Sequence, residues 1–335
     1  MARVFVIAEA GVNHEGSLAS ALEMVDAAAA AGADAVKFQT FSAARLVTHQ
    51  APKAAYQIET TGDSESQYEM LLRLELTDAD HAALLERCRE RGIVFMSAAF
   101  DVRSLHFLRD LGIDRVKVPS GELTNVPYLR EVAALRLPVL LSTGMATLDE
   151  VHGARDVLER AGLSREHVTV LQCTTEYPAP PESVNLRAMV AMRDVLGVHI
   201  GYSDHTEGIA IAIAAVALGA EVIEKHFTLD RALPGPDQAA SLEPAELAAM
   251  VCAIRDVEAA LGDGVKRPSR AELANAAVAR KSIVAAREIA RGEVLTADDL
   301  AVKRPGTGMS PLCWDDLVGR RASRDYHADD PIREG

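Results

Sequence analysis

Apolar runs typical of β-strands alternate with helical hydrophobic patterns along most of the chain. Strands are predicted at residues 4–10, 35–40, 93–99, 115–120, 138–143, 168–174, 199–204 and 222–228. Helices are predicted after them, at residues 17–31, 78–91, 102–111, 125–136, 147–161, 184–196, 208–219 and 243–261. Eight strand–helix units in about 260 residues predict a closed (β/α)8 TIM barrel. A doubly wound sheet is the alternative, but the turn AEAGVNHEG after the first strand lacks the GxGxxG pattern of that fold.

The pattern changes after Gly262. Residues 263–280 are polar and include a proline, which is typical of a linker with a short helix, whereas residues 281–335 contain short apolar pieces broken by turns. We therefore expect a catalytic barrel domain at 1–262, a linker at 263–280 and a small module at 281–335. One connection inside the barrel, residues 41–77, is long and follows the C-terminal end of its strand, where barrel enzymes keep functional loops.

The composition excludes several classes of function. The 335 residues carry a formal net charge of −14, and only 4% of them are aromatic, which argues against a surface for nucleic acid or for an anionic membrane. Four cysteines without CxxC spacing indicate a reduced, cytoplasmic protein with no cysteine metal site. The run MARVFVIAEAG reaches a glutamate at position 9 and predicts a strand rather than a signal peptide. The longest apolar stretch, residues 208–220, is too short to cross a bilayer.

Polar residues near the ends of the predicted strands are the candidates for chemistry, because strands of a parallel barrel are normally apolar on both faces. Six strands carry them at the same end. They are Glu9; Lys37 and Gln39; Lys117; Ser142; Ser203 and His205; and Glu224 and His226. A single residue of this kind is often a structural one with a buried partner. The recurrence on six strands predicts an active site, since barrel enzymes draw catalytic residues from the ends of several strands.

Two kinds of ligand suit these residue types. Lysines and serine hydroxyls form charge-assisted hydrogen bonds to phosphate, which fits Lys37, Lys117, Ser142 and Ser203. Two histidines from adjacent strands, His205 and His226, can share a divalent metal, with Glu9 as an oxygen ligand.

Phosphate and metal together are compatible with more than one reaction. One is a class II-like aldolase, and another is a phosphoenolpyruvate condensation in which the metal polarises an aldehyde. A Schiff-base aldolase with Lys117 or Lys225 as the nucleophile is a third possibility. The residue types alone do not separate these reactions.

The motifs together resemble those of the sialic acid synthases, the N-acetylneuraminate synthase family of bacterial nonulosonate synthases. The matching stretches, in chain order from residue 4 to about 310, are FVIAEAGVNHEGSL, AGADAVKFQTF, ESQYEMLLRLEL, KVPSGELTN, LSTGMATLDE, LQCTTEYPAP, GYSDHTEG, VIEKHFTLD, GPDQAASLEP and VKRPGTG. The module at 281–335 resembles the antifreeze-like SAF domain of this family, which has a β-clip fold.

The resemblance implies a set of roles. Lys37, Lys117, Ser142 and Ser203 would bind phosphoenolpyruvate, and His205 and His226 would bind Mn²⁺ or Mg²⁺. Residues that orient the sugar and the attacking groups would be Glu9, Gln39, Glu122, Tyr177 and Asp237. Glu9 or Glu122 would take a proton from the attacking water. Arg304 would reach the acyl group of the sugar from a partner subunit, which implies a domain-swapped homodimer.

The implied activity is that of an N-acetylneuraminate synthase, which condenses phosphoenolpyruvate with N-acetylmannosamine and water to give N-acetylneuraminate and phosphate. The alternative is an N,N'-diacetyllegionaminate synthase, which uses 2,4-diacetamido-2,4,6-trideoxymannose, because residues 51–71 resemble both branches. A non-catalytic sugar-binding or ice-binding protein is disfavoured because the candidate metal and phosphate residues are intact. The module also carries charges such as Lys303 and Arg304, whereas an ice-binding face should be poor in charge. A 3-deoxy-ulosonate phosphate synthase is disfavoured because those enzymes lack the module.

Overall fold

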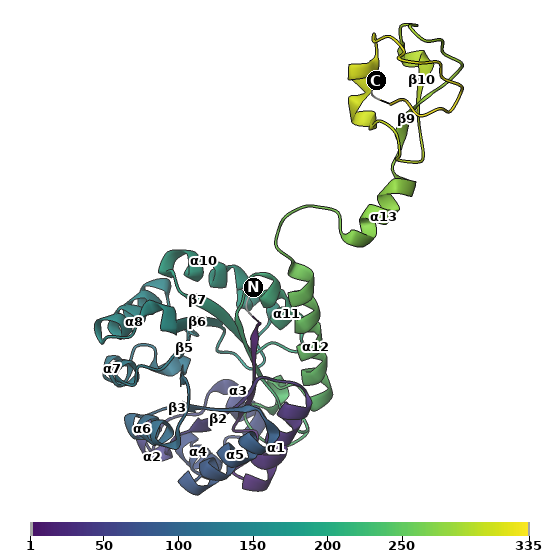
Figure 1. The fold of residues 1–335 in the computed structure, drawn as a ribbon. Helices are drawn as coiled ribbons and strands as arrows, with labels where there is room; N and C mark the ends of the chain where they lie inside the picture. The colour runs from purple at the N-terminus through teal and green to yellow at the C-terminus, as the bar shows by residue number, and fades with distance from the viewer. Residues whose placement is uncertain (1–2, 334–335) are drawn as a thin grey trace. The chain divides into compact units, whose positions relative to one another are not determined.

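A computed structural model describes residues 3–333 and divides the chain into two compact units, Met1–Gly262 and Asp263–Gly335. Eight parallel strands of the first unit close into a barrel in sequence order (Figure 1). They are β1 (Phe5–Gly11), β2 (Ala35–Thr40), β3 (Val94–Ala99), β4 (Val116–Val118), β5 (Val139–Ser142), β6 (Val168–Cys173), β7 (His199–Asp204) and β8 (Val222–His226). The pairing of β8 with β1 closes the barrel, and the predicted TIM-barrel fold is confirmed.

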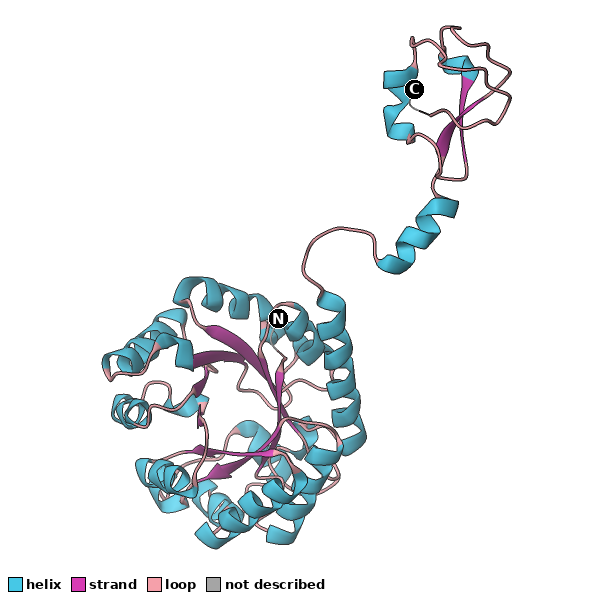
Figure 2. Ribbon diagram, viewed as in Figure 1, coloured by secondary structure: helices cyan, strands magenta, loops and turns pink. Residues whose placement is uncertain are grey.

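Helices surround the strands on the outside, as Figure 2 shows. The helices of the eight units are α1 (Leu18–Ala30), α5 (Asp78–Arg91), α6 (Val102–Leu111), α7 (Val126–Ala134), α8 (Leu148–Arg160), α10 (Leu186–Leu196), α11 (Ala210–Ala217) and α12 (Pro244–Leu261). Their apolar faces pack on outward strand residues such as Val6, Val36 and Ile223, all fully buried. Capping boxes at Thr77 and Thr147 begin α5 and α8, which explains these boundaries.

Some predicted boundaries differ from the structure for local reasons. The strand predicted at 115–120 is shorter in the structure, where β4 covers only Val116–Val118. Pro119 ends it because proline lacks the amide hydrogen that would continue the hydrogen-bond ladder. The helix predicted at 184–196 is divided into α9 (Pro181–Val184) and α10 by Asn185, whose φ of 50° is left-handed. The predicted eighth strand, 222–228, ends two residues earlier, at His226.

The long connection at 41–77 is not a plain loop. It contains three short helices, α2 (Ala43–Leu46), α3 (Ala55–Thr61) and α4 (Gln67–Leu74). Helix α4 begins with a capping box of Ser66 and Glu69 and buries Met70 and Leu74. Those two side chains pack in a small apolar cluster with Val12 and Phe41, so α4 is anchored to the barrel by apolar contacts.

The remaining elements of the barrel unit are single turns. They are the 3-10 helices η1 (Ser120–Glu122), η2 (Arg165–His167) and η3 (Gln238–Ala240). Two of them, η1 and η3, follow the C-terminal ends of β4 and β8 and belong to the loops around that end of the barrel.

The second unit is a small module with its own apolar core. It contains α13 (Arg270–Ala279), β9 (Ser282–Ala285), η4 (Ala297–Asp299), β10 (Leu300–Lys303), η5 (Pro311–Cys313) and α14 (Trp314–Leu317). The strands β9 and β10 pair antiparallel around Ile283, Leu300 and Ile332. Within residues 3–333, no helix combines the length and the apolar character needed to cross a membrane.

Candidate active site

A cavity opens at the C-terminal ends of the strands and contains most of the predicted residues. Eight of the twelve line it: Glu9, Gln39, Lys117, Ser142, Tyr177, Ser203, His205 and His226. Seven of them lie near or directly after the end of a strand, as Glu9 lies two positions after the inward Ile7 on β1 and Ser142 two positions after Leu140 on β5, whereas Tyr177 lies in the loop after β6. The predicted convergence of strand ends is therefore observed for seven of these eight residues.

Four charged side chains form a buried ionic cluster beneath the cavity. Lys37 Nζ lies 2.7 Å from Glu9 Oε2 and 3.6 Å from Glu224 Oε2, and Lys117 Nζ lies 3.4 Å from Glu224 Oε1. Ser203 Oγ donates a hydrogen bond of 3.0 Å to the same Glu224 oxygen. The four charged side chains are at most 4% exposed, so their interactions are little screened by water.

Burial and charge pairing set the protonation of this cluster. Burial opposes ionisation of Glu224, but Lys117 and Lys37 outweigh it and hold its pKa below the ordinary value. Burial also acts against charged Lys37, yet Glu224 and Glu9 raise its pKa. For Glu9, burial dominates and raises the pKa in spite of Lys37. The cluster thus combines a firmly ionised Glu224 with a Glu9 carboxylate that takes up a proton more readily.

His205 and His226 lie beside each other at the end of β7 and β8, with ring centroids 5.3 Å apart. His205 Nδ1 lies 2.6 Å from the carbonyl oxygen of Thr174 and must donate to it, which leaves Nε2 with a free lone pair. Burial lowers the pKa of His205 to about 4 and the pKa of His226 well below its ordinary value. Both rings are therefore neutral at pH 7, the form that binds a metal.

An aromatic and acidic wall borders the histidines. The ring of Tyr177 lies against His205 at 4.1 Å and meets His226 edge-on at 5.6 Å between centroids. Asp237 Oδ2 lies 3.9 Å from His226 Nδ1 and is buried, and burial raises its pKa to about 7. Ser241 Oγ donates to the backbone oxygen of Asp237 and keeps its loop in place.

Gly11 allows the backbone to pass close to the side chains of Glu9, His226 and Gln39. Its φ of +53° is left-handed, and an added Cβ would lie 3.4 Å from both Glu9 Oε1 and His226 Cε1 and 3.5 Å from Gln39 Nε2. The carboxylate, the imidazole and the amide therefore surround one backbone position, which places Gln39 near His226.

Other predicted residues lie elsewhere. Glu122 is half-buried in η1, where its carboxylate accepts from Asn125 Nδ2 at 2.6 Å, and it is not among the described residues that line the cavity. Arg304 is exposed after β10 in the second unit. Lys225 forms a fully buried pair with Asp204, at 3.0 Å, and is not among the described residues that line the cavity, so its ammonium group is not presented there as a Schiff-base nucleophile.

Two residues outside the predicted roles matter for the geometry. Glu224 contacts both lysines and Ser203, and the alternation that places it on the same face as His226 was the signal for it. Tyr56 of α3 stacks on Tyr177, with ring centroids 5.0 Å apart and planes 30° apart. No sequence pattern indicates that contact, since the two residues are brought together only by the fold.

Comparison with known proteins shows the family of this chain. Residues 24–266 match the NeuB family, and residues 280–335 match the SAF domain. The chain is 46% identical to the N,N'-diacetyllegionaminic acid synthase of Campylobacter jejuni, over 100% of both chains. It is 48% identical to the enzyme of the same name from Legionella pneumophila, over 97% of this chain and 92% of the relative.

A solved structure gives the same result. The crystal structure of an N-acetylneuraminic acid (sialic acid) synthetase from Leptospira borgpetersenii, in complex with citrate, has a TM-score of 0.72 at 34% identity, over 82% of this chain and 90% of the other. The predicted resemblance is confirmed, including the SAF domain. The chain is therefore an enzyme that belongs to the NeuB family and carries a C-terminal SAF domain.

Proposed function

We propose that this enzyme is an N,N'-diacetyllegionaminate synthase, which condenses phosphoenolpyruvate with 2,4-diacetamido-2,4,6-trideoxymannose and water. The observation that carries the proposal is the identity of 46% and 48%, over almost the whole chain, to two synthases of that name. The sialic acid synthetase of known structure is less similar, at 34%. The first interpretation of the sequence, N-acetylneuraminate synthesis, therefore gives way to its alternative.

The cavity wall supports this sugar. Phe100, Pro119 and Met145 give it an apolar side. The proposed sugar carries a methyl group at C6 in place of the hydroxymethyl group of N-acetylmannosamine, and its second acetamido group adds another methyl, so it presents more apolar surface. Burial of such groups against apolar side chains is favourable, by about 25 cal/mol per Å².

Phosphoenolpyruvate would bind at the ionic cluster. Ser142 Oγ is buried without a hydrogen-bond partner among the described residues, so a ligand oxygen would satisfy it. Lys37 and Lys117 share Glu224 as a partner and Lys37 also pairs with Glu9, and an incoming phosphate would add acceptors for their remaining N–H groups. The lysines then offset the charge of the phosphate as it departs.

The two histidines fit a divalent metal such as Mn²⁺ or Mg²⁺. Both are neutral, His205 Nε2 keeps its lone pair, and the buried His226 Nδ1 has no hydrogen-bond partner within residues 3–333. In the same range no group of three or more His, Cys, Asp and Glu side chains is gathered as a metal site, so ligands from the substrate and water would complete the set. When bound, the metal would supply Lewis-acid polarisation of the sugar aldehyde.

The proton and bond changes assign roles to the carboxylates. The new bond joins C3 of phosphoenolpyruvate to the aldehyde carbon, and the aldehyde oxygen takes up a proton and becomes a hydroxyl. Water adds its oxygen at C2, and the C2–O bond to phosphate breaks, which leaves a ketone at C2 and releases phosphate. The water must lose a proton, and Glu9 suits that task because it lines the cavity and has a raised pKa. Glu122 does not line the cavity, so we assign the role to Glu9.

Arg304 would complete the sugar site from a partner subunit in a domain-swapped homodimer. Its guanidinium is exposed and follows a strand, so it is available to an amide carbonyl of the sugar. A mixture of His205→Ala and Arg304→Ala proteins tests this arrangement. Activity should return after subunit exchange, because one site of the heterodimer has both residues. Confirmed exchange without activity would show that Arg304 does not act in trans.

The proposed activity is tested by measuring phosphate release from phosphoenolpyruvate with three sugars. These are 2,4-diacetamido-2,4,6-trideoxymannose, N-acetylmannosamine and arabinose 5-phosphate. The kcat/KM for the first should exceed that for the second by at least about tenfold, the discrimination expected from a few apolar contacts. A preference for N-acetylmannosamine would restore the first interpretation, and turnover of arabinose 5-phosphate alone would refute both.

A further inference from the structure

Helix α3 borders the candidate active site, but it has little apolar anchorage of its own. None of its seven residues is buried, in contrast to α4, which buries Met70 and Leu74. A helix of this length is unstable in isolation, because too few hydrogen bonds offset the cost of nucleation. Polar and aromatic contacts must therefore hold α3 in position.

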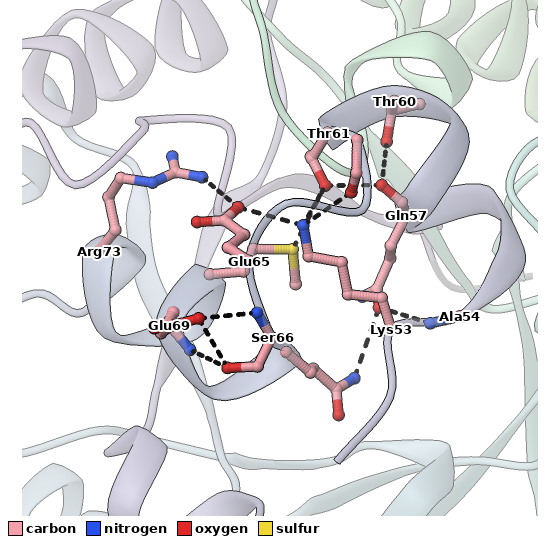
Figure 3. Close-up of polar contacts among 12 residues, drawn as sticks. Lys53, Ala54, Gln57, Thr60, Thr61, Glu65, Ser66, Glu69 and Arg73 are labelled. Atoms are coloured by element: carbon pink, nitrogen blue, oxygen red, sulfur yellow. Dashed lines mark hydrogen bonds and ion pairs between the residues drawn. The ribbon is translucent and has the colours of Figure 1, made fainter. Parts of the chain in front are cut away.

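Lys53 supplies the polar contacts, as Figure 3 shows. Its side chain is 2% exposed, and its ammonium group donates to Thr61 Oγ1 at 2.9 Å, to the backbone oxygen of Gly62 at 3.0 Å and to Glu65 Oε1 at 3.2 Å. All three donors of the ammonium group are thus used. Because Lys53 precedes α3, while Thr61 ends it and Gly62 and Glu65 follow it, the contacts connect the two ends of the helix.

The same contacts connect α3 to the anchored part of the structure. Arg73 of α4 bonds Glu65 at 3.0 Å and also reaches Glu15 Oε2 at 3.5 Å. Gln238 donates to the other oxygen of Glu15 at 2.6 Å, and it is the residue after Asp237. The network therefore extends from Lys53 to the loop that carries an acidic residue of the site.

Tyr56 is the side chain through which α3 reaches the site. It stacks on Tyr177, whose ring contacts both metal-candidate histidines. Partial burial raises the pKa of Tyr56, and the negative charge of the Asp237 carboxylate raises it further. Tyr56 thus connects α3 to the aromatic wall of the site through its stacking on Tyr177.

We propose that Lys53 and Tyr56 are positioning residues for the sugar: Lys53 holds α3 in place, and Tyr56 thereby keeps Tyr177 oriented toward the sugar end of the cavity. This inference rests on the proposed function for the identity of the sugar. The phosphate end of the cavity is formed by Lys117 on β4 and Ser142 on β5, so phosphoenolpyruvate binding should be unaffected by changes at α3.

Steady-state kinetics with both substrates test the proposal. Lys53→Met and Tyr56→Ala should each raise the KM for the sugar about tenfold, the size of a lost aromatic contact, and leave the KM for phosphoenolpyruvate unchanged. Tyr56→Phe keeps the ring and should behave as wild type. Leu72→Ala is the matched control, because Leu72 lies on α4 and is 54% exposed. An equal rise in both KM values, or no rise for the sugar, would overturn the proposal.

A double variant separates positioning from general destabilisation. If Lys53 acts through Tyr56, the KM for the sugar in Lys53→Met/Tyr56→Ala should be no higher than in Tyr56→Ala. If the two residues act independently, their effects on that KM should multiply. Lys53→Met should fold, since Glu65 keeps Arg73 as its partner and no charge is left unpaired. Multiplicative effects in a folded double variant would contradict the proposed order of action.

Hydrogen exchange gives a result that does not depend on the substrate. Two amides at α3 report on the helix: the Ile58 amide donates to the Ala54 oxygen, and the Gly62 amide donates to the Ile58 oxygen. In ligand-free Lys53→Met both should lose protection from exchange, and the amides of α4 should keep theirs. Unchanged protection would refute the role of Lys53 even if the proposed reaction is correct. Conversely, a wild-type enzyme inactive with every sugar would refute the proposed function and leave the exchange result standing.

Discussion

Two layers of side chains fill the barrel interior, and on β1, β2, β5 and β8 they lie only two residues apart. The lower layer is apolar and contains Ile7, Ala35, Met96, Leu140, Leu171 and Val222. The upper layer contains Glu9, Lys37, Ser142, Ser203 and Glu224, with Lys117 from β4. Both layers are equally buried, since residues of either one are at most 6% exposed. The two layers therefore differ in chemistry rather than in access to water.

The difference teaches what each layer is for. Apolar burial in the lower layer is favourable, so it closes the barrel and supports the layer above. Burial of four charged groups in the upper layer is costly, and pairing only partly offsets the cost, so stability does not explain it. Substitutions in the lower layer should change stability, and those in the upper layer should change binding and catalysis. The following predictions test that division.

The largest effect is expected where the upper layer meets the metal-candidate histidines. His226→Ala should remove a metal ligand and with it several kcal/mol of transition-state stabilisation, which is a loss of about a thousandfold or more in kcat. EDTA should have the same effect on wild type, and Mn²⁺ should reverse it. Titration of Mn²⁺ by electron paramagnetic resonance should show weaker binding to the variant. Full activity of a metal-free preparation would contradict the assignment.

Leu140→Ala tests the lower layer, on the same strand as Ser142. Leu140 is 4% exposed, and truncation of such a residue costs about 2–5 kcal/mol in the free energy of unfolding. Urea denaturation should show this loss. The KM for phosphoenolpyruvate should change little, because the strand still presents Ser142 upward. A large rise in that KM without loss of stability would contradict the division between layers.

Lys117→Met should change binding more than stability. The substitution removes a charge-assisted contact to phosphate, worth about 1.5–3 kcal/mol, and should raise the KM for phosphoenolpyruvate by the corresponding factor of about 10 to 150. Glu224 keeps Lys37 and Ser203 as partners, so no carboxylate is stranded. Isothermal titration with phosphoenolpyruvate measures the effect, and wild-type affinity would make Lys117 a purely structural residue.

The sequence predicted much of this division, for a physical reason. The side chains of a strand alternate between its two faces, so Lys37 and Gln39 share a face, and charged residues among apolar neighbours mark the functional end of the barrel. The count of strand–helix units predicted the fold. The proximity of His205 and His226 was predicted from their places at the ends of two consecutive strands, and β7 does pair with β8.

Other features depend on distances across the fold that periodicity does not contain. Glu224 becomes the shared partner of two lysines only when β2, β4 and β8 face one another across the closed barrel. The helices α3 and α4 lie in a segment without a long apolar period, and Lys53 is an ordinary lysine until its three acceptors are known. Glu122 comes shortly after a strand, as the other candidates do, but it lies in η1, where its carboxylate accepts from Asn125 and does not line the cavity.

The smallest effect is expected for Ser142→Ala, one step above Leu140 on β5. The buried Ser142 hydroxyl has no hydrogen-bond partner among the described residues, so its removal should leave the free energy of unfolding unchanged or raise it slightly. A hydrogen bond to phosphoenolpyruvate would be lost, which should raise the KM about 2- to 12-fold, for roughly 0.5–1.5 kcal/mol. Urea denaturation and steady-state kinetics on one preparation give both values. The opposite pattern, a loss of stability with an unchanged KM, would place Ser142 in the structural layer with Leu140.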